Sequence, residues 1–135
     1  MQVLVDTSVW SLALRRRKAP VQATEQAACA RLQDLVADGR AMLIGPVRQE
    51  LLNGVKDGEQ FERLRAALAA FPDEPLVQAD YEGAAIYFNL CTGKGIQGSN
   101  TDFLICAVAV SRKLPIYTLD RDFALFQRHL PITLL

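Results

Sequence analysis

The chain has 135 residues, which is enough for one compact domain and too few for two ordinary ones. Half of the residues are hydrophobic and 22% are charged, so the chain can bury a core, and this composition excludes the disordered and fibrous classes. Fifteen Lys and Arg balance fifteen Asp and Glu, which argues against nucleic-acid binding through a general excess of positive charge. We expect a single domain that spans residues 1–135.

The cysteines and the apolar runs indicate where the protein resides. Cys29, Cys91 and Cys106 are widely spaced and form no Cys-x-x-Cys pair, which is typical of buried free thiols in a reducing compartment. Charged residues interrupt every apolar run well before the ~18 residues that a membrane span needs, and the first residues lack the pattern of a signal peptide. We therefore expect a cytoplasmic protein without a membrane segment.

Short apolar runs alternate with helical patterns along the chain. Residues 3–5, 42–44 and 116–118 are typical of short buried parallel strands, and residues 132–134 are a candidate fourth strand. The predicted helices span residues 7–14, 20–37, 47–55, 59–70, 76–90, 101–111 and 120–127. This alternation predicts an α/β fold with a parallel sheet between helices. The helix over 101–111 is apolar almost all round and is expected to be buried against the sheet.

Carboxylates gather where the predicted strands end. Asp6 directly follows the first strand, and Asp120 and Asp122 follow the strand at 116–118. Glu50 lies early in the helix after the second strand, and Asp102 begins the buried helix. In open parallel α/β sheets ligands bind beyond the carboxyl ends of the strands, so these side chains are candidates for one shared site.

Each carboxylate also has an ordinary structural explanation. An Asp at a helix start caps the helix and complements its dipole, and a Glu on a helix is commonly solvated. Four or five carboxylates at one sheet edge, however, would repel one another and raise one another's pKa values unless a cation lay among them. Oxygen ligands without histidine or thiolate suit Mg²⁺ or Mn²⁺ better than zinc.

Other chemistries find little support. His129 is the only histidine and is expected on the surface near a helix end, so a two-histidine ribonuclease mechanism is excluded. The sequence contains neither a Gly-x-Ser-x-Gly elbow nor a phosphate-binding P-loop. A receiver-like Mg²⁺-binding signalling module remains as an alternative. Such modules have an acidic pair after the first strand and a lysine just after the last main strand. Here Asp6 stands alone after the first strand, and Lys113 precedes the strand at 116–118.

Four segments of the sequence resemble the conserved blocks of PIN-domain nucleases. They are VLVDTSVW at 3–10, PVRQELLNG at 46–54, NTDFLICAVA at 100–109 and YTLDRDF at 117–123. Together they extend over almost the whole chain, in the order of the family. In size, the chain resembles the VapC-type toxins of type II toxin–antitoxin pairs.

The resemblance implies a PIN-like three-layer α/β/α sandwich with a short, mainly parallel central sheet. It also implies an endoribonuclease that depends on Mg²⁺ or Mn²⁺ and has four acidic residues for catalysis and metal binding: Asp6, Glu50, Asp102 and Asp120. Asp122 matches a further acidic metal position, and Ser8 matches a hydroxyl beside the carboxylates. The family implies a homodimer that a cognate antitoxin holds inactive; a PIN-domain RNA-processing enzyme that is not a toxin is an alternative.

The expected chemistry agrees with this donor set. Divalent ions lower the pKa of a water that attacks phosphorus in line and they stabilise the leaving oxygen, which leaves a 5′-phosphate and a 3′-hydroxyl on the RNA. Thr7 or Ser8 is expected to orient Asp6 or a water, or simply to cap the following helix.

Two further sets of residues have alternative explanations. The basic run at residues 15–18 is either a solvated helix end or a contact for phosphates or for an acidic antitoxin segment. The aromatic residues are expected in the core or in a dimer interface: Trp10, Tyr81, Tyr87 and Phe88. Without the five candidate site carboxylates, ten acidic residues face fifteen basic ones, a balance of +5 that would suit an RNA partner.

Overall fold

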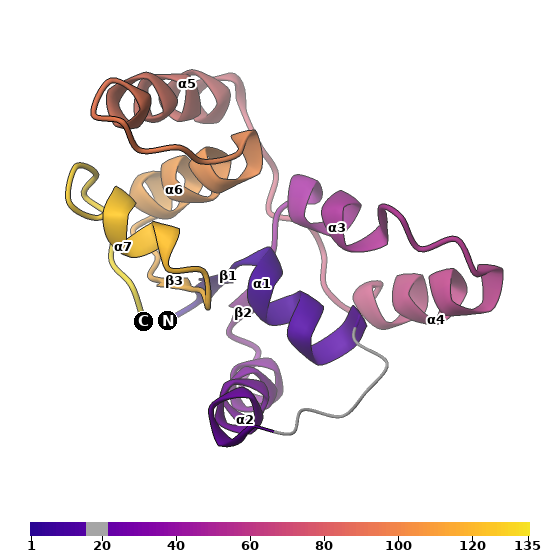
Figure 1. Cartoon of the computed structure of the whole chain (residues 1–135). Coiled ribbons are helices and arrows are strands. Elements are labelled where there is room, and N and C mark those ends of the chain that lie inside the picture. Colours follow the sequence, from indigo (N-terminus) through magenta and orange to yellow (C-terminus); the bar gives the residue numbers. More distant parts are fainter. Residues whose placement is uncertain (16–21) are drawn as a thin grey trace.

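Three short parallel strands form the centre of the computed structural model, which describes residues 1–15 and 22–135 (Figure 1). The strands are β1 (Val3–Val5), β2 (Ala41–Met42) and β3 (Ile116–Tyr117), in the order β2-β1-β3. In the register of the sheet, Val3 pairs with Ala41 on one side of β1, and Val5 pairs with Tyr117 on the other. The central strand β1 is buried along its whole length, as its three apolar residues predict.

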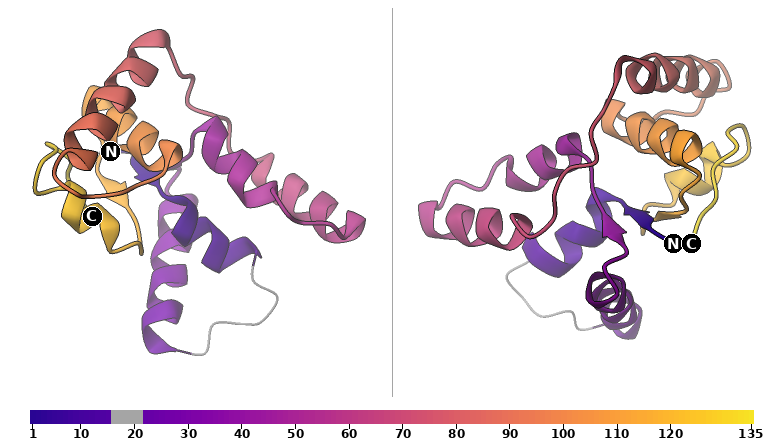
Figure 2. Two further views of the ribbon diagram at one scale, coloured as in Figure 1. Left: turned by 45° about the horizontal axis from the view of Figure 1, so that its top comes forward. Right: turned by 180° about the vertical axis from the view of Figure 1, so that it is seen from behind.

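Helices cover both faces of this sheet. In the described part of the chain they are α1 (Thr7–Trp10), the π-helical turn η1 (Ser11–Arg15), α2 (Ala23–Ala37), α3 (Gly45–Leu52), α4 (Gly58–Leu68), α5 (Gln78–Thr92), α6 (Asn100–Arg112) and α7 (Asp122–Phe126). Figures 1 and 2 show α5 and α6 on one side of the strands and α1, α3 and α4 on the other. The predicted three-layer α/β/α arrangement with a short parallel sheet is therefore confirmed.

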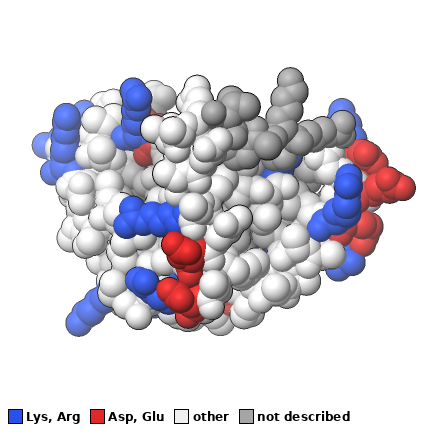
Figure 3. Space-filling model, turned by 90° about the horizontal axis from the view of Figure 1, so that it is seen from below, with Lys and Arg blue, Asp and Glu red and all other residues white. Residues whose placement is uncertain are grey.

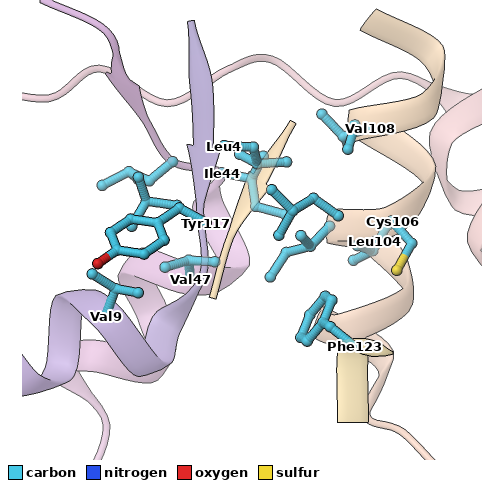
Figure 4. Packing of buried hydrophobic residues seen from close by; sticks show 14 of the residues in the cluster. Leu4, Val9, Ile44, Val47, Leu104, Cys106, Val108, Tyr117 and Phe123 are labelled. Carbon is cyan, nitrogen blue, oxygen red and sulfur yellow. The ribbon is translucent and has the colours of Figure 1, made fainter. Parts of the chain in front are cut away.

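The core lies between α6 and the sheet and continues to the helices on the far side. Every residue of α6 from Phe103 to Ala109 is buried, which confirms the prediction drawn from its apolar circumference. Figure 4 shows Leu104 and Val108 of α6 on one side of the strands, and Val9 of α1 and Val47 of α3 on the other. The position of α6 is thus fixed by packing along almost its whole length.

Several boundaries differ from those predicted. The strand predicted at 42–44 is found at Ala41–Met42, one residue earlier and one residue shorter, because Ile44 already forms the N-cap of α3 and Leu43 makes only an isolated bridge with Asp73. The candidate strand at 132–134 is wrong as a strand, since Leu134 makes a single bridge with Ile116. The predicted helix at 7–14 is continuous but changes from α to π geometry at Ser11.

The other helix ends shift by up to three residues. The predicted helix start at residue 20 lies outside the described residues, and α2 is described from Ala23. Cys29, Cys91 and Cys106 are all free, as expected, but only Cys91 and Cys106 are buried, whereas Cys29 is half-buried. Among the described helices, none combines the length and the apolar character that crossing a membrane requires.

Candidate active site

Asp6 lies at the carboxyl end of β1, where it also caps α1. Its main-chain N–H donates to the carbonyl oxygen of Tyr117 (2.9 Å), which fixes the residue beside β3. Its carboxylate accepts two hydroxyl hydrogen bonds at Oδ2, from Ser8 Oγ (2.7 Å) and from Thr118 Oγ1 (2.8 Å). The residue is only 3% exposed, and burial raises the pKa of Asp6 although these hydrogen bonds lower it. One carboxylate thus caps a helix and occupies the strand edge.

Asp102 lies in the first turn of α6 and forms a capping box with Ser99. The N–H of Ser99 donates to Asp102 Oδ2 (3.0 Å), and the N–H of Asp102 donates to Ser99 Oγ (3.1 Å). The pKa of Asp102 is raised to about 6, mainly by burial and in part by the negative charges of Asp6 and Asp120. Two carboxylates from other segments, Asp6 and Asp120, therefore act electrostatically on Asp102 at this edge of the sheet.

Gly98 allows the start of α6 to pack closely against α7. A Cβ atom at this position would lie 2.6 Å from Phe126 Cζ and 2.9 Å from Phe103 Cε2, distances that side-chain carbons do not adopt. The two rings also contact each other, with centroids 5.0 Å apart. The two rings leave no room for a side chain at position 98, directly before the N-cap Ser99. Glycine there lets the start of α6, which carries Asp102, lie close to α7 and the loop after β3.

Asp120 is half-buried in the loop between β3 and α7. Its N–H donates to Thr118 Oγ1 (3.0 Å), and its Oδ1 accepts the N–H of Asp122 (2.9 Å). Asp122 is exposed, and the contact described for it with Asp120 is made by its main chain. The structure therefore brings Asp120 into the electrostatic neighbourhood of Asp102, but it describes no such interaction for the Asp122 carboxylate.

Glu50 reaches the site from α3, on the side of the sheet opposite α6. Its Oε1 accepts the hydroxyl of Thr7 (3.0 Å), and Thr7 is the residue directly after Asp6. Thr7 and Ser8 consequently have different partners, because the Thr7 hydroxyl holds Glu50 while the Ser8 hydroxyl holds Asp6. Thr7 and Ser8 are adjacent at the start of α1, and the sequence alone does not show which hydroxyl contacts which carboxylate.

The residues fit a hard divalent cation by chemistry rather than by preformed geometry. Within residues 1–15 and 22–135, no three His, Cys, Asp or Glu side chains converge closely enough to hold a metal ion as they stand. The donors are nevertheless all carboxylates, and none of the ion pairs described for this part of the chain involves Asp6, Asp102 or Asp120. A cation would favour the ionised form of Asp102, whose pKa is raised mainly by burial and in part by the charges of Asp6 and Asp120.

Thr118 is a residue of this site that sequence reasoning missed. It directly follows β3 and stands two positions before Asp120, and it was assigned only to the end of a strand. Its hydroxyl contacts Asp6, which is 112 residues away in the sequence. The available signal was a short polar side chain between a buried strand and the Asp at the edge of the sheet.

Other residues considered in the sequence lie away from the carboxylates or outside the described residues. Arg15 donates from Nη2 to the carbonyl oxygen of Asn53 (2.9 Å), just after α3, whereas residues 16–18 of the basic run lie outside the described part of the chain. Trp10 is 1% exposed and belongs to the core, as predicted. Tyr81 is 54% exposed on α5, so it does not belong to the core of the monomer. His129 is exposed shortly after α7, as expected.

The surface in Figure 3 shows how charges are distributed on one face of the molecule. Basic and acidic side chains lie next to each other there, and much of the face is uncharged. Among the described residues, neither sign of charge forms a continuous patch on this face.

Comparison with known proteins places this geometry in a family. A family model described as the PIN domain matches residues 3–128. Similar solved structures include FitAcB from Neisseria gonorrhoeae, with a TM-score of 0.75, 19% identity, and coverage of 99% of this chain and 96% of that one. A toxin–antitoxin complex from Klebsiella pneumoniae has a TM-score of 0.65, 22% identity and 91% coverage of each chain. VapBC2 from Rickettsia felis, bound to a DNA fragment from their promoter, has a TM-score of 0.70, 16% identity, and coverage of 100% and 98%.

These findings differ in what they establish. Curated protein sequences gave no match. The solved structures are at most 22% identical among those described and establish the shared fold. The family match extends over almost the whole chain, and PIN-domain nucleases are hydrolases that act on nucleic acids. The chain belongs to the PIN-domain family.

Proposed function

We propose that this protein is an endoribonuclease that depends on Mg²⁺ or Mn²⁺ and acts as the toxin of a type II toxin–antitoxin pair. The observation that carries the nuclease activity is the group formed by Asp6, Asp102 and Asp120. These carboxylates come from three segments, and the charges of Asp6 and Asp120 both act on Asp102. None of the three has a described arginine or lysine partner. A fold rarely keeps such an arrangement for stability alone, since repulsion between unpaired carboxylates is destabilising.

The proposed metal ligands are the three carboxylates at the strand edge together with Glu50. Ser8 and Thr118 hold the Asp6 carboxylate through Oδ2, and Ser99 holds the Asp102 carboxylate through Oδ2. Thr7 orients Glu50. Asp122, whose side chain is exposed, is proposed as a further acidic metal ligand. We assign catalysis to Asp6, Glu50, Asp102 and Asp120.

A bound divalent ion supplies activation of a water nucleophile and neutralisation of charge at the scissile phosphate. The chain's own contribution is to keep its carboxylates ionised and correctly placed for that ion. Since Asp102 has a pKa of about 6, its ionised form prevails only above that pH in the absence of a cation. Binding of a cation to this site therefore competes with protons, and the affinity should rise as the pH rises through about 6.

Cleavage of RNA by the purified protein tests the nuclease activity. We expect cleavage with Mg²⁺ or Mn²⁺, products with 5′-phosphate and 3′-hydroxyl ends, and loss of activity with EDTA. The substitutions Asp6→Asn and Asp102→Asn should each reduce cleavage by at least about 100-fold, because each removes one charge that holds the cation. The matched control is Asp34→Asn, which changes an exposed aspartate on α2 and should leave cleavage unchanged.

Two outcomes would contradict the proposed nuclease. One is cleavage that persists in EDTA, and the other is cleavage that survives both Asp6→Asn and Asp102→Asn. A receiver-like module would instead be labelled by a small phosphodonor and would not cleave RNA, and the PIN-domain match over residues 3–128 disfavours that alternative.

The proposed antitoxin partner draws on the solved structures of similar fold. One of them is named as a toxin–antitoxin complex from Klebsiella pneumoniae, and another as a VapBC family member, VapBC-5, from Mycobacterium tuberculosis. A small reading frame immediately upstream, whose product binds this chain and blocks RNA cleavage, is the expected finding. RNA cleavage without such a neighbour and without inhibition of growth on expression would favour a PIN-domain RNA-processing enzyme that is not a toxin.

We also propose that the protein forms a homodimer. Helix α5 exposes several large hydrophobic side chains to solvent, and these are Tyr81 (54%), Ile86 (64%), Phe88 (38%) and Leu90 (42%). Exposed apolar surface of this kind is typical of protein interfaces. Light scattering should give the mass of a dimer, and Ile86→Glu should shift it to the mass of a monomer without changing helical content.

A further inference from the structure

Two hydroxyl groups connect the Asp6 carboxylate to the loop between β3 and α7. Ser8 Oγ donates to Asp6 Oδ2 (2.7 Å) and accepts the N–H of Leu119 (3.0 Å). Thr118 Oγ1 donates to the same Oδ2 (2.8 Å) and accepts the N–H of Asp120 (3.0 Å). The two oxygens lie 3.4 Å apart. Each hydroxyl is thus a donor on one side and an acceptor on the other, and the two bridges run in parallel.

The bridge through Thr118 joins two of the proposed ligand residues directly. A hydroxyl has one proton to donate, and Thr118 uses it on Asp6 while its lone pair receives the main chain of Asp120. The separation between the Asp6 carboxylate and the main chain of Asp120 is therefore set by two hydrogen bonds of 2.8 and 3.0 Å. The Ser8 bridge ends one residue earlier, on Leu119, and does not reach Asp120.

This connection acts against the electrostatics of the site. Asp6 and Asp120 both carry negative charge close to Asp102, so repulsion alone would move the segments that carry them apart. The segment after β3 is a short loop between Tyr117 and Asp122, and it can move more easily than a packed helix. A hydrogen-bonded side chain at its first residue opposes that movement.

We propose that Thr118 is a positioning residue that fixes the distance between Asp6 and Asp120 for binding of a divalent cation, a role that rests on the proposed nuclease function. Thr118 itself binds neither the cation nor the RNA. Without its hydroxyl, Asp6 keeps the hydrogen bond from Ser8, whereas the N–H of Asp120 loses its acceptor. The loop can then relax away from Asp6. Part of the free energy of cation binding is then used to bring the loop back, so the measured affinity is weaker.

The test measures Mn²⁺ binding to the full chain by calorimetry, without RNA. Thr118→Val keeps the shape of the side chain and removes the hydroxyl, and it should weaken Mn²⁺ binding by about 10-fold or more. Thr118→Ser restores a hydroxyl at the same position and should return the affinity to within about 3-fold of the natural chain. The control is Thr92→Val on α5, where the hydroxyl donates to Phe88 O (2.8 Å), and it should leave Mn²⁺ binding unchanged.

A second measurement separates positioning from folding. The turnover number for RNA should fall in Thr118→Val while KM for RNA stays unchanged, and the Tm in EDTA should stay within a few degrees of the natural chain. If Thr118→Val does not melt cooperatively, Thr118→Ala takes its place in the same binding experiment.

The outcomes distinguish the positioning role from the nuclease function. Unchanged Mn²⁺ affinity in the folded Thr118→Val or Thr118→Ala variant would overturn the positioning role and leave the nuclease intact. Failure of Thr118→Ser to restore binding would overturn it as well. If the natural chain itself neither binds Mn²⁺ nor cleaves RNA, the proposed function fails, and the positioning role fails with it.

Discussion

Asp6 and Asp80 are each 3% exposed, yet the protein surrounds these two buried aspartates in opposite ways. Asp80 accepts hydrogen bonds from both Nη1 (2.6 Å) and Nη2 (2.9 Å) of Arg112, whose Nε also donates to Glu74 (3.1 Å). The guanidinium of Arg112 holds the pKa of Asp80 below its ordinary value. Asp6, by contrast, accepts from hydroxyl and main-chain donors among the described residues, and burial raises its pKa.

The two environments lie toward opposite ends of α6. Arg112 is the last residue of this helix, while Asp102, which acts electrostatically with Asp6, lies in its first turn. The same buried helix therefore ends in a neutralised ion pair and begins in an unneutralised group of carboxylates. This difference is expected if the first arrangement serves stability and the second has the proposed role of binding a cation, which lowers stability when no cation is bound.

The largest effect on stability is expected where the charge is already neutralised. Asp80→Asn removes the negative charge and one of the two carboxylate oxygens that Arg112 contacts, and the Arg112 side chain is largely buried. The substitution should lower the free energy of unfolding by about 3 kcal/mol. Because the folded pKa of Asp80 lies below its unfolded value, its contribution is present above pH ~4 and is lost as the pH falls further. Urea unfolding of both proteins at pH 7 and at pH 3 measures it.

A control for this experiment is the exposed pair of Glu62 and Arg65 on α4, in which Arg65 Nη2 lies 2.8 Å from Glu62 Oε2. Glu62→Gln should leave the unfolding midpoint unchanged, since exposed ion pairs contribute little. An Asp80→Asn variant as stable as the natural chain would show that the ion pair of Asp80 and Arg112 does not stabilise the fold.

A smaller effect is expected at the packing that places the acidic end of α6. Gly98→Ala puts a Cβ against the rings of Phe103 and Phe126 and should lower the free energy of unfolding by about 1–3 kcal/mol. It should also reduce RNA cleavage, because relief of the clash moves the start of α6 and with it Asp102. Gly58→Ala on α4, where a Cβ meets nothing within 4 Å, is the matched control.

The acidic end should respond to charge removal in the opposite direction from Asp80. Without divalent ions at pH 7.5, Asp102→Asn should raise the free energy of unfolding by about 1 kcal/mol, because it removes a half-buried charge that no Lys or Arg among the described residues neutralises. The increase should show as a higher Tm in EDTA. A fall in Tm would mean that Asp102 acts chiefly as a helix cap.

The pH dependence of that difference is the smallest effect and the most specific. The folded pKa of Asp102 is raised to about 6, so its stabilising contribution is present below the unfolded value of about 4 and is lost as the pH rises through about 6. The gap between the natural chain and Asp102→Asn should therefore open between pH 4 and pH 6 and stay constant above. A gap that does not change with pH would contradict an unneutralised carboxylate at this position.

Local patterns in the sequence predicted the parts of the fold that depend on local forces. The apolar circumference of α6 and the three apolar residues of β1 predicted burial correctly, since burial of a whole element leaves a pattern in consecutive residues. The π-helical turn at Ser11–Arg15 and the single bridge at Leu134 were not predictable in this way. Packing between distant segments decides them, and consecutive residues carry no trace of it.

The candidate site divides along the same line. Asp6 and Asp120 were predictable because each follows a strand, and carboxyl ends of parallel strands share one edge. The role of Thr118 was not, since its acceptor Asp6 lies 112 residues away and a threonine at a strand end has many ordinary explanations. The ion pair of Asp80 and Arg112 was missed because these two residues also lie far apart in the sequence.

Thermal unfolding with and without Mn²⁺ at pH 7.5 tests most directly whether the unneutralised carboxylates form a cation site. Saturating Mn²⁺ should raise the Tm of the natural chain by a few degrees relative to EDTA, because the ion binds the folded state alone. The same addition should leave Asp102→Asn almost unchanged. An equal rise in both proteins, or no rise in the natural chain, would contradict a divalent-cation site built on Asp6, Asp102 and Asp120.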